Sequence, residues 1–560
     1  MSDITRTRPN ADQMDLLISS VNAIGDAIAN GGNGGFIGGL LTEANYKTVM
    51  KKWFMQKGAA SMTDFTALCD QWYLITRTGW TGGVKFLLPQ ENVTQSSDGV
   101  KTGDNAELTC TPSTTTVKNT DDYAGIPLFF PIDVNVELDS NGEPHITAID
   151  GICGAFERYN TAKIVGVMQM TGWIRYYEDG TYYGFEYTDA IGAAGFYPLP
   201  EAVKLSDNTV RTWVVHGKYG FGEGWTCCSG QRVKVFNVSH NTQLTGIRTA
   251  WSNRYCGATS ADDAFMKLML YLKYGTLDSD RVLHGCCGYN LDYTPALAET
   301  GVERVLITTA QAANVLVGST MHLSTTARGG TVVADRVQVV SVETVEIEGT
   351  SYGAVYVDNG GVTFDTDTTQ HFCSLQWFTG TTDAVLGNDG GINPANDRYP
   401  VKIQGIEYMV GCYEVMGDTI LSFADVDGVA CQIANVCRDA TKLSTSVTSD
   451  YIQSNHGVPR PAAAGWVYAK RLGHDPDLPE IMIPSVAGAS SSSGTRDGFY
   501  EEADTATGLR EWLRFGRLGL GVGNAGLSCG SGDSGLGGAY WGLGGRLSVT
   551  GNRGEFQAAA

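Results

Sequence analysis

Glycine and large apolar residues alternate along the C-terminal stretch that starts at Leu509, and this pattern limits the possible folds more than any other segment. Average glycine usage is about 7%, so the local bias is strong. A flexible Gly/Ser linker lacks large side chains, whereas this stretch carries Trp512, Phe515, Leu527 and Trp541. The pattern therefore predicts a backbone held at fixed apolar points, with free positions between them. The glycines are Gly516, Gly519, Gly521, Gly523, Gly526, Gly530, Gly532, Gly535, Gly537, Gly538, Gly542, Gly544 and Gly545.

The overall composition is that of a globular, acidic protein. Of the 560 residues, 42% are hydrophobic and 18% are charged, and a chain of this length exceeds one core, so we expect roughly two to four domains. The formal net charge of −21 argues against nucleic acid as a partner, because phosphate binding needs a basic surface. No apolar run approaches the ~18 residues of a membrane helix, and the first residues, MSDITRTRPNADQ, lack a signal-peptide core. We expect synthesis in the cytoplasm and no membrane insertion.

No motif for catalysis or for metal or cofactor binding stands out. The thirteen cysteines include no CxxC pair, so we expect mostly buried thiols rather than a zinc site or a disulfide framework. The eight histidines include no H-E-x-x-H, and we assign structural roles to His216, His240 and His284. Paired catalytic carboxylates cannot be picked out among sixty Asp and Glu. We therefore expect no catalytic residue, no metal and no cofactor, and a protein that is not an enzyme.

Two short motifs resemble binding loops, but the residues around them do not complete either kind of site. Residues 521–526 (GVGNAG) match G-x-G-x-x-G, yet a dinucleotide site also needs a preceding strand, a following helix and an acidic residue about twenty positions on. Residues 425–428 (DVDG) resemble the start of a calcium loop, but Val436 stands where the Glu at the twelfth position belongs. The sequence predicts an ordinary turn at 425–428.

Three segments have helical patterns. Residues 12–29 place apolar side chains at spacings of three and four, as in a coiled-coil seam, but two heptads leave open whether this helix packs on its own chain or on a second subunit. After a glycine-rich joint at 30–39, a second helix is expected over 43–56, ending at Gly58. A third covers 260–274, with Ser260 as N-cap, Asp263 completing a capping box, and Gly275 as its stop. Its apolar stripe consists of Ala264, Phe265, Leu268 and Leu272.

From about residue 80 onward most of the chain has the pattern of short β-strands separated by Gly, Asn and Asp turns. Residues 178–180 (EDG) lie between two aromatic-rich runs and predict a hairpin turn. Residues 301–375 alternate with period two, are rich in β-branched side chains and show no clear helix, which indicates a small inserted barrel or sandwich. A flexible loop is expected over 487–498, before the final segment.

Several stretches together resemble a known family. In the C-terminal part these are 497–500 (DGFY), 515–527 (FGRLGLGVGNAGL), 535–548 (GLGGAYWGLGGRLS) and 550–556 (TGNRGEF). Upstream, FYPLPEAVKLSDNTVRTWVVHGKYG, SADDAFMKLMLYLKYGTLDSDRVLHGCCGYN and AETGVERVLITTAQAANVLVGS extend the match. The chain resembles the variable proteins of diversity-generating retroelements, of the kind carried by tailed phages of gut bacteria. Proteins of this family carry a C-type-lectin-like domain related to the fold of formylglycine-generating enzymes.

The resemblance implies an α+β fold, with a C-type-lectin-like domain, an inserted small all-β domain and a helical N-terminal region. The helical region, at 1–58, would serve attachment or oligomerisation, and a β-rich region would follow at 59–124. The lectin-like domain would come in two parts, at 125–300 and 376–560, separated by the insert at 301–375. The variable region, at about 515–547, would lie in the second part.

The genetic code offers a check on the variable region. In this family the retroelement misreads template adenines, so that AAC and AAT codons can change into many others but never encode Lys, Glu, Gln, Met or Trp. Between Phe515 and Leu547 the chain has none of the first four, and its single Trp, Trp541, stands where the family keeps a fixed Trp. The absence of these residues favours a diversified segment.

The resemblance assigns the positions of this segment to two groups. The structural anchors are Trp512, Phe515, Gly516, Ala525, Gly526, Leu527, Trp541, Gly544, Gly545, Arg546 and Leu547. The variable, ligand-binding positions are Arg517, Gly519, Leu520, Asn524, Cys529, Gly530, Ser531, Asp533, Ser534, Gly538, Tyr540, Gly542 and Leu543. Among the variable positions, Tyr540, Arg517, Leu520 and Leu543 are expected to make the best side-chain contacts, since Tyr and Arg are typical hot-spot residues.

The implied function is host attachment by a phage tail-fibre or tail-tip protein, located in the virion, that binds a protein or glycan receptor on the host cell surface. Its partners would be other tail proteins and further copies of itself, with a trimer expected from the heptads and from the habit of the family. Two alternatives stay open: a virion adhesin that is not diversified, and a copper-dependent oxidase of the formylglycine-generating type. The doublets Cys227-Cys228 and Cys286-Cys287 do not show the cysteine motif of that oxidase.

Overall fold

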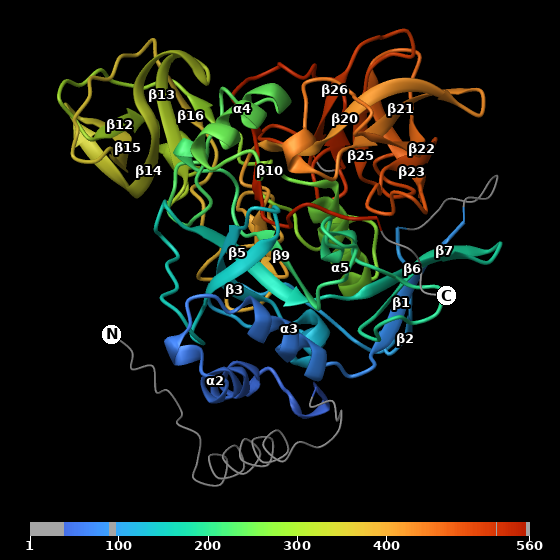
Figure 1. The fold of residues 1–560 in the computed structure, drawn as a ribbon. Helices are drawn as coiled ribbons and strands as arrows, with labels where there is room; N and C mark the ends of the chain where they lie inside the picture. Colours follow the sequence, from blue (N-terminus) through green and yellow to red (C-terminus); the bar gives the residue numbers. More distant parts are fainter. Residues whose placement is uncertain (1–37, 89–96, 522, 556–560) are drawn as a thin grey trace.

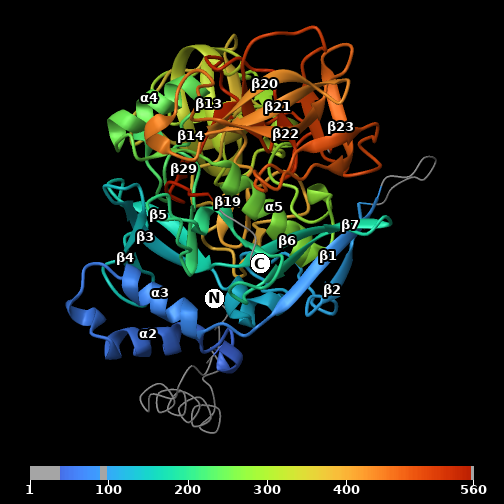
Figure 2. The same cartoon turned by 45° about the vertical axis from the view of Figure 1, so that its right-hand side comes forward.

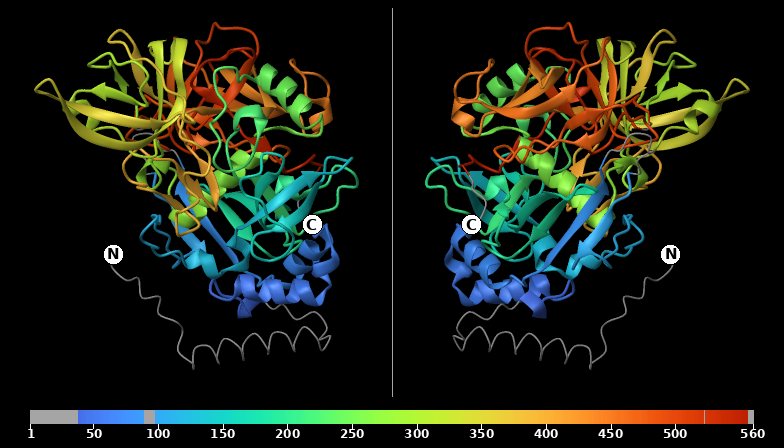
Figure 3. Two further views of the ribbon diagram at one scale, coloured as in Figure 1. Left: turned by 90° about the vertical axis from the view of Figure 1, so that its left-hand side faces the viewer. Right: turned by 90° about the vertical axis from the view of Figure 1, so that its right-hand side faces the viewer.

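The computed structural model describes residues 38–88, 97–521 and 523–555. This part of the chain is mostly β-structure with few helices, arranged in several sheets. The N-terminal helices lie at one end, and the strands of residues 304–374 and of 413–514 lie side by side at the other (Figure 1). Figure 2 and both views in Figure 3 show the same order from end to end. None of the described helices combines the length and the hydropathy that a membrane span requires.

Two N-terminal helices pack on a shared aromatic core. The indole of Trp72 donates a hydrogen bond to the hydroxyl of Tyr46 at 3.0 Å, and the ring of Tyr46 stacks on Phe130 with 3.8 Å between centroids. The helix expected over 43–56 is confirmed, whereas the one expected over 12–29 lies outside the described residues. Besides its strands, the range 59–124 contains a helix, because Trp72 and its apolar neighbours bury one helical face. The helices are α2 (Tyr46–Gln56), α3 (Thr66–Ile75), α4 (His240–Ala250), α5 (Ser260–Tyr274) and α6 (Thr309–Ala312).

Two antiparallel sheets lie next to the N-terminal helices α2 and α3. The first has the strand order β2-β1-β7-β6-β8 and the second the order β4-β3-β5-β9. Gly180, at φ 80°, lies in the connection between β6 and β7, which confirms the hairpin predicted at 178–180. The strands are β1 (Thr81–Leu87), β2 (Val100–Gly103), β3 (Ile132–Leu138), β4 (Pro144–Ile149), β5 (Ile164–Met170), β6 (Trp173–Glu178), β7 (Tyr182–Thr188), β8 (Tyr197–Pro198) and β9 (Trp213–Gly217).

Helix α5 lies at the centre of the molecule and is buried on nearly all sides, so it is not the amphipathic helix that its stripe predicted. Its capping box uses Thr259 and Asp262, one residue before the predicted pair: the hydroxyl of Thr259 accepts from the Asp262 amide at 3.2 Å. Ser260 is not the cap because its amide and hydroxyl both donate to the buried carboxylate of Asp418. The helix ends at Gly275, at φ 64°, as predicted.

Residues 292–374 form a six-stranded sheet with the order β11-β16-β13-β14-β15-β12. This sheet has its own hydrophobic cluster, which includes Val305, Leu323 and Phe372. It occupies most of the range expected for an inserted β unit, and it also contains the short helix α6, which the sequence did not indicate. The strands are β11 (Asp292–Tyr293), β12 (Arg304–Ile307), β13 (Thr320–Thr326), β14 (Gly329–Ile347), β15 (Thr350–Asp358) and β16 (His371–Ser374).

The C-terminal part forms the largest sheet, with the order β22-β21-β20-β26-β27-β25-β23-β24 and with β28 beside β20. At 425–428 the amide of Gly428 donates to the carboxylate of Asp425 at 2.7 Å, so the predicted ordinary turn is confirmed. Its strands are β20 (Tyr413–Val426), β21 (Val429–Val436), β22 (Ile452–Pro459), β23 (Gly465–Leu472), β24 (Pro484–Ala487), β25 (Gly498–Glu501), β26 (Arg510–Arg514), β27 (Gly530–Ser531) and β28 (Leu543–Gly544). The smaller sheets are the pair β10 (Cys256–Gly257) and β29 (Leu547–Ser548), and the three-stranded sheet of β17 (Gly390–Gly391), β18 (Val401–Ile403) and β19 (Ile406–Tyr408).

Candidate ligand-binding face of the C-terminal segment

Both ends of the glycine-rich segment are bound to one buried carboxylate, that of Glu414 in β20. Arg514, the last residue of β26, donates from Nη2 to Glu414 Oε2 at 2.7 Å. Arg546, near the other end of the segment, donates from Nη2 to Oε1 at 2.8 Å and from Nε to Oε2 at 3.2 Å. Residues 515–545 therefore form a loop that starts and ends beside Glu414, and we call this three-residue contact the Glu414 clamp.

The Glu414 clamp lies in the interior and ties the loop to the rest of the molecule. Burial by itself raises the pKa of Glu414, but Arg546 and Arg514 together hold it below its ordinary value. Arg546 Nη1 also donates to the carbonyl of Gly217 in β9 at 2.8 Å. Arg514 Nη1 lies 3.7 Å from Asp263 Oδ1 in α5. The loop therefore begins and ends on the central helix and sheets.

Inside the loop, apolar side chains and backbone amides are held by their neighbours. Leu518 and Leu527 are fully buried. The amide of Gly523 donates to Asp280 Oδ2 at 2.6 Å, and the amide of Leu527 donates to Ser279 Oγ at 2.8 Å. Of the predicted anchors, Trp541 is half-buried and all the others are buried; these are Trp512, Phe515, Gly516, Ala525, Gly526, Leu527, Gly544, Gly545, Arg546 and Leu547.

Glycine is required at four of these anchors by the close approach of other atoms. A Cβ atom added at Gly516, Gly526, Gly544 or Gly545 would lie 2.2–2.6 Å from its nearest neighbouring atom. Contacts this short force a shift of the surrounding structure, because a close-packed interior has no room for another methyl group. These four glycines therefore belong to the frame of the loop.

The predicted variable positions divide into surface and interior groups. Eight of the thirteen are exposed or half-exposed, and five are buried. The first group is Arg517, Gly519, Leu520, Asn524, Asp533, Ser534, Gly538 and Tyr540, and the second is Cys529, Gly530, Ser531, Gly542 and Leu543.

Leu543 was expected to be one of the best ligand contacts, and this expectation is wrong for the folded chain. Its side chain is 0% exposed and lies in a hydrophobic cluster with Tyr413, Val415 and Leu513. The cause is the pairing of β28 with β20, which places Leu543 directly beside Tyr413. Leu543 therefore packs in the hydrophobic core and stabilises the loop.

Arg517, Tyr540 and Trp541 form a cluster at the surface of the loop. The guanidinium carbon of Arg517 lies 5.4 Å from the ring centroid of Trp541 and 5.9 Å from that of Tyr540. The two rings meet edge to face at 6.1 Å. Arg328, from the β13–β14 connection of the inserted sheet, lies 4.7 Å from the Trp541 centroid. Two cations thus contact one half-buried indole, an arrangement that offers charge and flat apolar surface to a ligand.

Of the remaining surface positions, some lie near this cluster and others lie apart from it. Asp533 is near the cluster, as its effect on Tyr540 shows. Burial raises the pKa of Tyr540 most, the charge of Arg517 lowers it, and the charge of Asp533 raises it. Ser534 is beside Gly538, where an added Cβ would lie 3.7 Å from the Ser534 Cβ. Asn524 is separate, and its side-chain oxygen accepts a hydrogen bond from the hydroxyl of Tyr468 at 2.6 Å. The structure therefore brings Arg517, Asp533 and Tyr540 together on one face, whereas Asn524 lies apart from them.

At two of the variable positions glycine can hardly be replaced by another residue, and at a third it can be replaced only if neighbouring side chains move. Gly519 has φ 90°, a conformation that side chains rarely adopt. A Cβ at Gly530 would lie 2.6 Å from the ring of Phe499. At Gly542 the obstacles are the side chains of Arg517 and Tyr540, both 2.5 Å away. A larger residue at 542 therefore requires those two side chains to move.

Sequence reasoning missed the residues that the inserted sheet adds to this face. Arg328 Nη2 donates to Asn290 Oδ1 at 2.6 Å and to the carbonyl of Leu291 at 3.0 Å. The carbonyl of Trp541 in turn accepts from Gln376 Nε2 at 3.0 Å. No local motif signals these contacts, because they join residues that are 37 to 165 positions apart in the chain.

The other sequence predictions for binding motifs can be compared with the structure. All thirteen cysteines are free thiols and only Cys110 is not buried, which confirms the expectation of mostly buried thiols. His216, assigned a structural role, is buried with its Nδ1 2.8 Å from Asp262 Oδ1. In the described residues around 521–526, no helix follows the G-x-G-x-x-G match.

Comparison with known proteins gives no assignment: no protein-family model matches the chain, and no curated protein matches it.

Replacing Glu414 should show how strongly the clamp holds the loop. In Glu414→Gln the charge that compensates two buried guanidinium groups is lost, and breaking a buried ion pair costs about 3–5 kcal/mol. We expect a loss of this size in the free energy of unfolding, measured by urea denaturation. The control is Glu502→Gln, which breaks the half-exposed pair with Arg510 at 3.4 Å and should cost about 0–1 kcal/mol. Equal losses in the two variants would contradict the special role of the clamp.

Stability should fall as the pH rises from about 6.5 to 8, and Glu511 should contribute to the fall. Burial raises the pKa of Glu511 to about 8, so in this range the folded protein keeps a proton that the unfolded chain has released. Ionisation then favours unfolding, by up to about 2 kcal/mol over this interval. Glu511→Gln, which stays uncharged, should flatten the curve of unfolding free energy against pH. Parallel curves for the variant and the unchanged protein would rule out this contribution.

Proposed function

We propose that this chain is a phage tail-associated receptor-binding protein that displays a retroelement-diversified surface for host attachment. The segment 509–555 would belong to a C-type-lectin-like domain, whose second part carries the variable region. The observation that carries the proposal is the Glu414 clamp: both ends of the loop are fixed in the interior, and eight predicted variable positions reach the surface between them. A fixed frame with replaceable surface residues is what a diversified binding site requires, since exposed substitutions change stability little.

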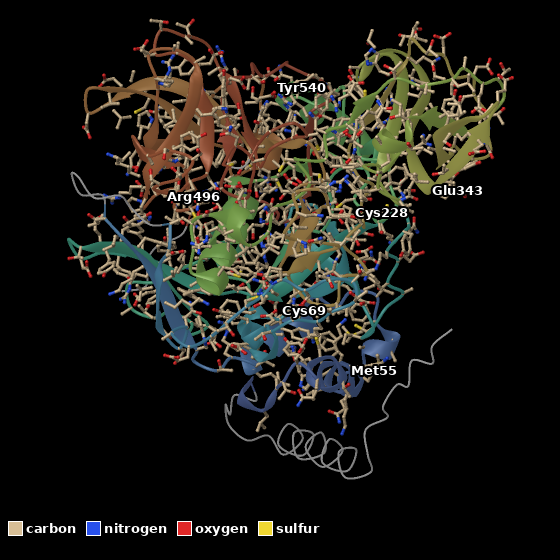
Figure 4. The ribbon with its side chains drawn as sticks, turned by 180° about the vertical axis from the view of Figure 1, so that it is seen from behind. Met55, Cys69, Cys228, Glu343, Arg496 and Tyr540 are labelled. Atoms are coloured by element: carbon tan, nitrogen blue, oxygen red, sulfur yellow. The ribbon has the colours of Figure 1, made fainter. Side chains whose placement is uncertain are left out.

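The position of the face in the molecule agrees with such a role. Tyr540 and Met55 of α2 lie toward opposite ends of the protein (Figure 4). Attachment to other tail proteins and to further copies of the chain, as in a trimer, would use the end that holds α2, and receptor binding would use the end that holds Tyr540. Several copies on one virion would raise the apparent affinity without new contacts.

Two other functions remain as alternatives. A virion adhesin that is not diversified would have the same frame and the same face. A copper-dependent oxidase of the formylglycine-generating type is less well supported, because burial raises the pKa of Cys227, Cys228, Cys286 and Cys287. A cysteine that reacts as a nucleophile needs a lowered pKa and access to solvent.

Sequencing of related phage isolates tests diversification. We expect replacements at the surface positions other than Gly519, which its φ of 90° restricts, with Gly516, Gly526, Gly544 and Gly545 unchanged. The same genomes should encode a reverse transcriptase near a second copy of the segment that differs only at adenines. Replacements spread evenly over the protein, without either genomic feature, would leave the adhesin as the better reading.

Binding to cells tests the face itself. Arg517→Ala and Tyr540→Ala should each weaken binding of the purified protein to the host cells, by about 10-fold or more, as expected for a hot-spot residue. The melting temperature should change little, since both side chains are half-exposed. The control is Tyr159→Ala, at a tyrosine that is 67% exposed and lies outside the segment. Unchanged binding in both face variants would locate the receptor site elsewhere.

A further inference from the structure

Three side chains capable of binding a metal lie together on the inserted sheet, next to the face described above. Asp292, His371 and Cys373 each present one ligand atom, and these atoms all lie within 4.8 Å of one another. The Nδ1 atom of His371 is 2.9 Å from Asp292 Oδ1. The thiol of Cys373 donates to the same oxygen at 3.2 Å. No other group of this kind occurs in the described residues.

The register of two strands brings the three side chains together. Asp292 of β11 is paired directly with Cys373 of β16, and directly opposed residues of an antiparallel pair have side chains on one face. His371 lies two positions before Cys373 and therefore shares that face. Phe372, between them, points the other way, into the hydrophobic cluster of the sheet. The arrangement depends on strand pairing, so it is as rigid as the sheet.

We propose that Asp292, His371 and Cys373 bind one Zn²⁺ ion. A thiolate, an imidazole and a carboxylate are all zinc ligands, and the mixture of soft and borderline donors favours zinc over calcium or magnesium. Binding replaces the thiol proton of Cys373 with the metal and releases that proton to solvent. Water fills the fourth position of a tetrahedral site, which is open to solvent because the side chains of His371 and Asp292 are 37% and 40% exposed.

The neighbouring groups fit a site with three protein ligands. His322 is opposite Cys373 on β13, but its Nδ1 lies 3.4 Å from Asp335 Oδ1, so it belongs to another contact. Arg328 is the nearby cation, and its Nε donates to the carbonyl of Ser374 at 3.2 Å. Its hydrogen bonds go to carbonyl oxygens and to Asn290, and its charge also acts on Asp292 and Cys373.

A bound ion would join the first and last strands of the inserted sheet at the point where they meet the variable segment. Strand β11 has two residues and follows directly after Asn290 and Leu291, which hold Arg328 against Trp541. The inference does not depend on receptor binding, because it concerns the insert alone.

Metal titration of the full chain tests the site. Protein stripped with a chelator and kept reduced is titrated with Zn²⁺ by calorimetry, and with Co²⁺ by absorption spectroscopy. We expect about one high-affinity ion per chain and a cobalt spectrum with a thiolate charge-transfer band. Cys373→Ser and His371→Gln should weaken Zn²⁺ binding by more than about 100-fold, beyond the effect of losing an outer-shell partner.

The control variant is Cys110→Ser, which removes a cysteine that also neighbours a carboxylate, with Sγ 3.6 Å from Asp389 Oδ2, but that belongs to no such group of three. It should bind zinc as the unchanged protein does. If Cys373→Ser fails to fold, His371→Gln and Asp292→Asn decide, since both side chains are partly exposed. No stoichiometric ion, no thiolate band, or equal affinity in the ligand variants and the control would overturn the proposal.

Discussion

One buried carboxylate determines how the C-terminal half of this protein can be arranged. Glu414 accepts hydrogen bonds from two arginines that are 32 positions apart (514 and 546). Buried ions are costly to desolvate, so such a contact contributes less to net stability than to the choice of one arrangement over others. Any structure that separated either end of the loop from β20 would leave an unpaired charge in the interior. The loop ends are thereby specified even though glycine dominates the sequence between them.

The same principle extends to the central helix. Asp263 of α5 lies near Arg514 and forms an ion pair with Lys267 at 2.7 Å. Asp418, which binds the first residue of α5, also pairs with Arg553 at 2.6 Å. Charged groups that are buried and paired therefore connect α5, β20, β26 and the last described residues. This network explains why a helix with polar residues in its first turn can lie in the middle of the molecule.

Local patterns predicted local structure well. The ends of α2 and α5, the hairpin at 178–180, the turn at 425–428 and the burial of every apolar anchor except Trp541 followed from residue spacing and turn chemistry. The cap of α5 lies one residue earlier than predicted. The failures concern contacts between distant segments. Leu543 looked like a surface residue until β28 was found beside β20, and Arg328 reached Trp541 from another sheet. The pair His371 and Cys373, two apart on a strand, is invisible to a search for CxxC or helical spacings, and its third member arises only from pairing with β11.

The crowding around Gly542 limits which combinations of side chains this surface can carry. A side chain there would enter the volume that Arg517 and Tyr540 now fill. The three positions are therefore coupled: a bulky residue at 542 is compatible only with smaller or redirected neighbours. Substitutions at these sites would be non-additive, and the number of folded combinations would be smaller than the product of the choices at each. Among functional copies, the residue sizes at 517, 540 and 542 should compensate for one another rather than vary independently.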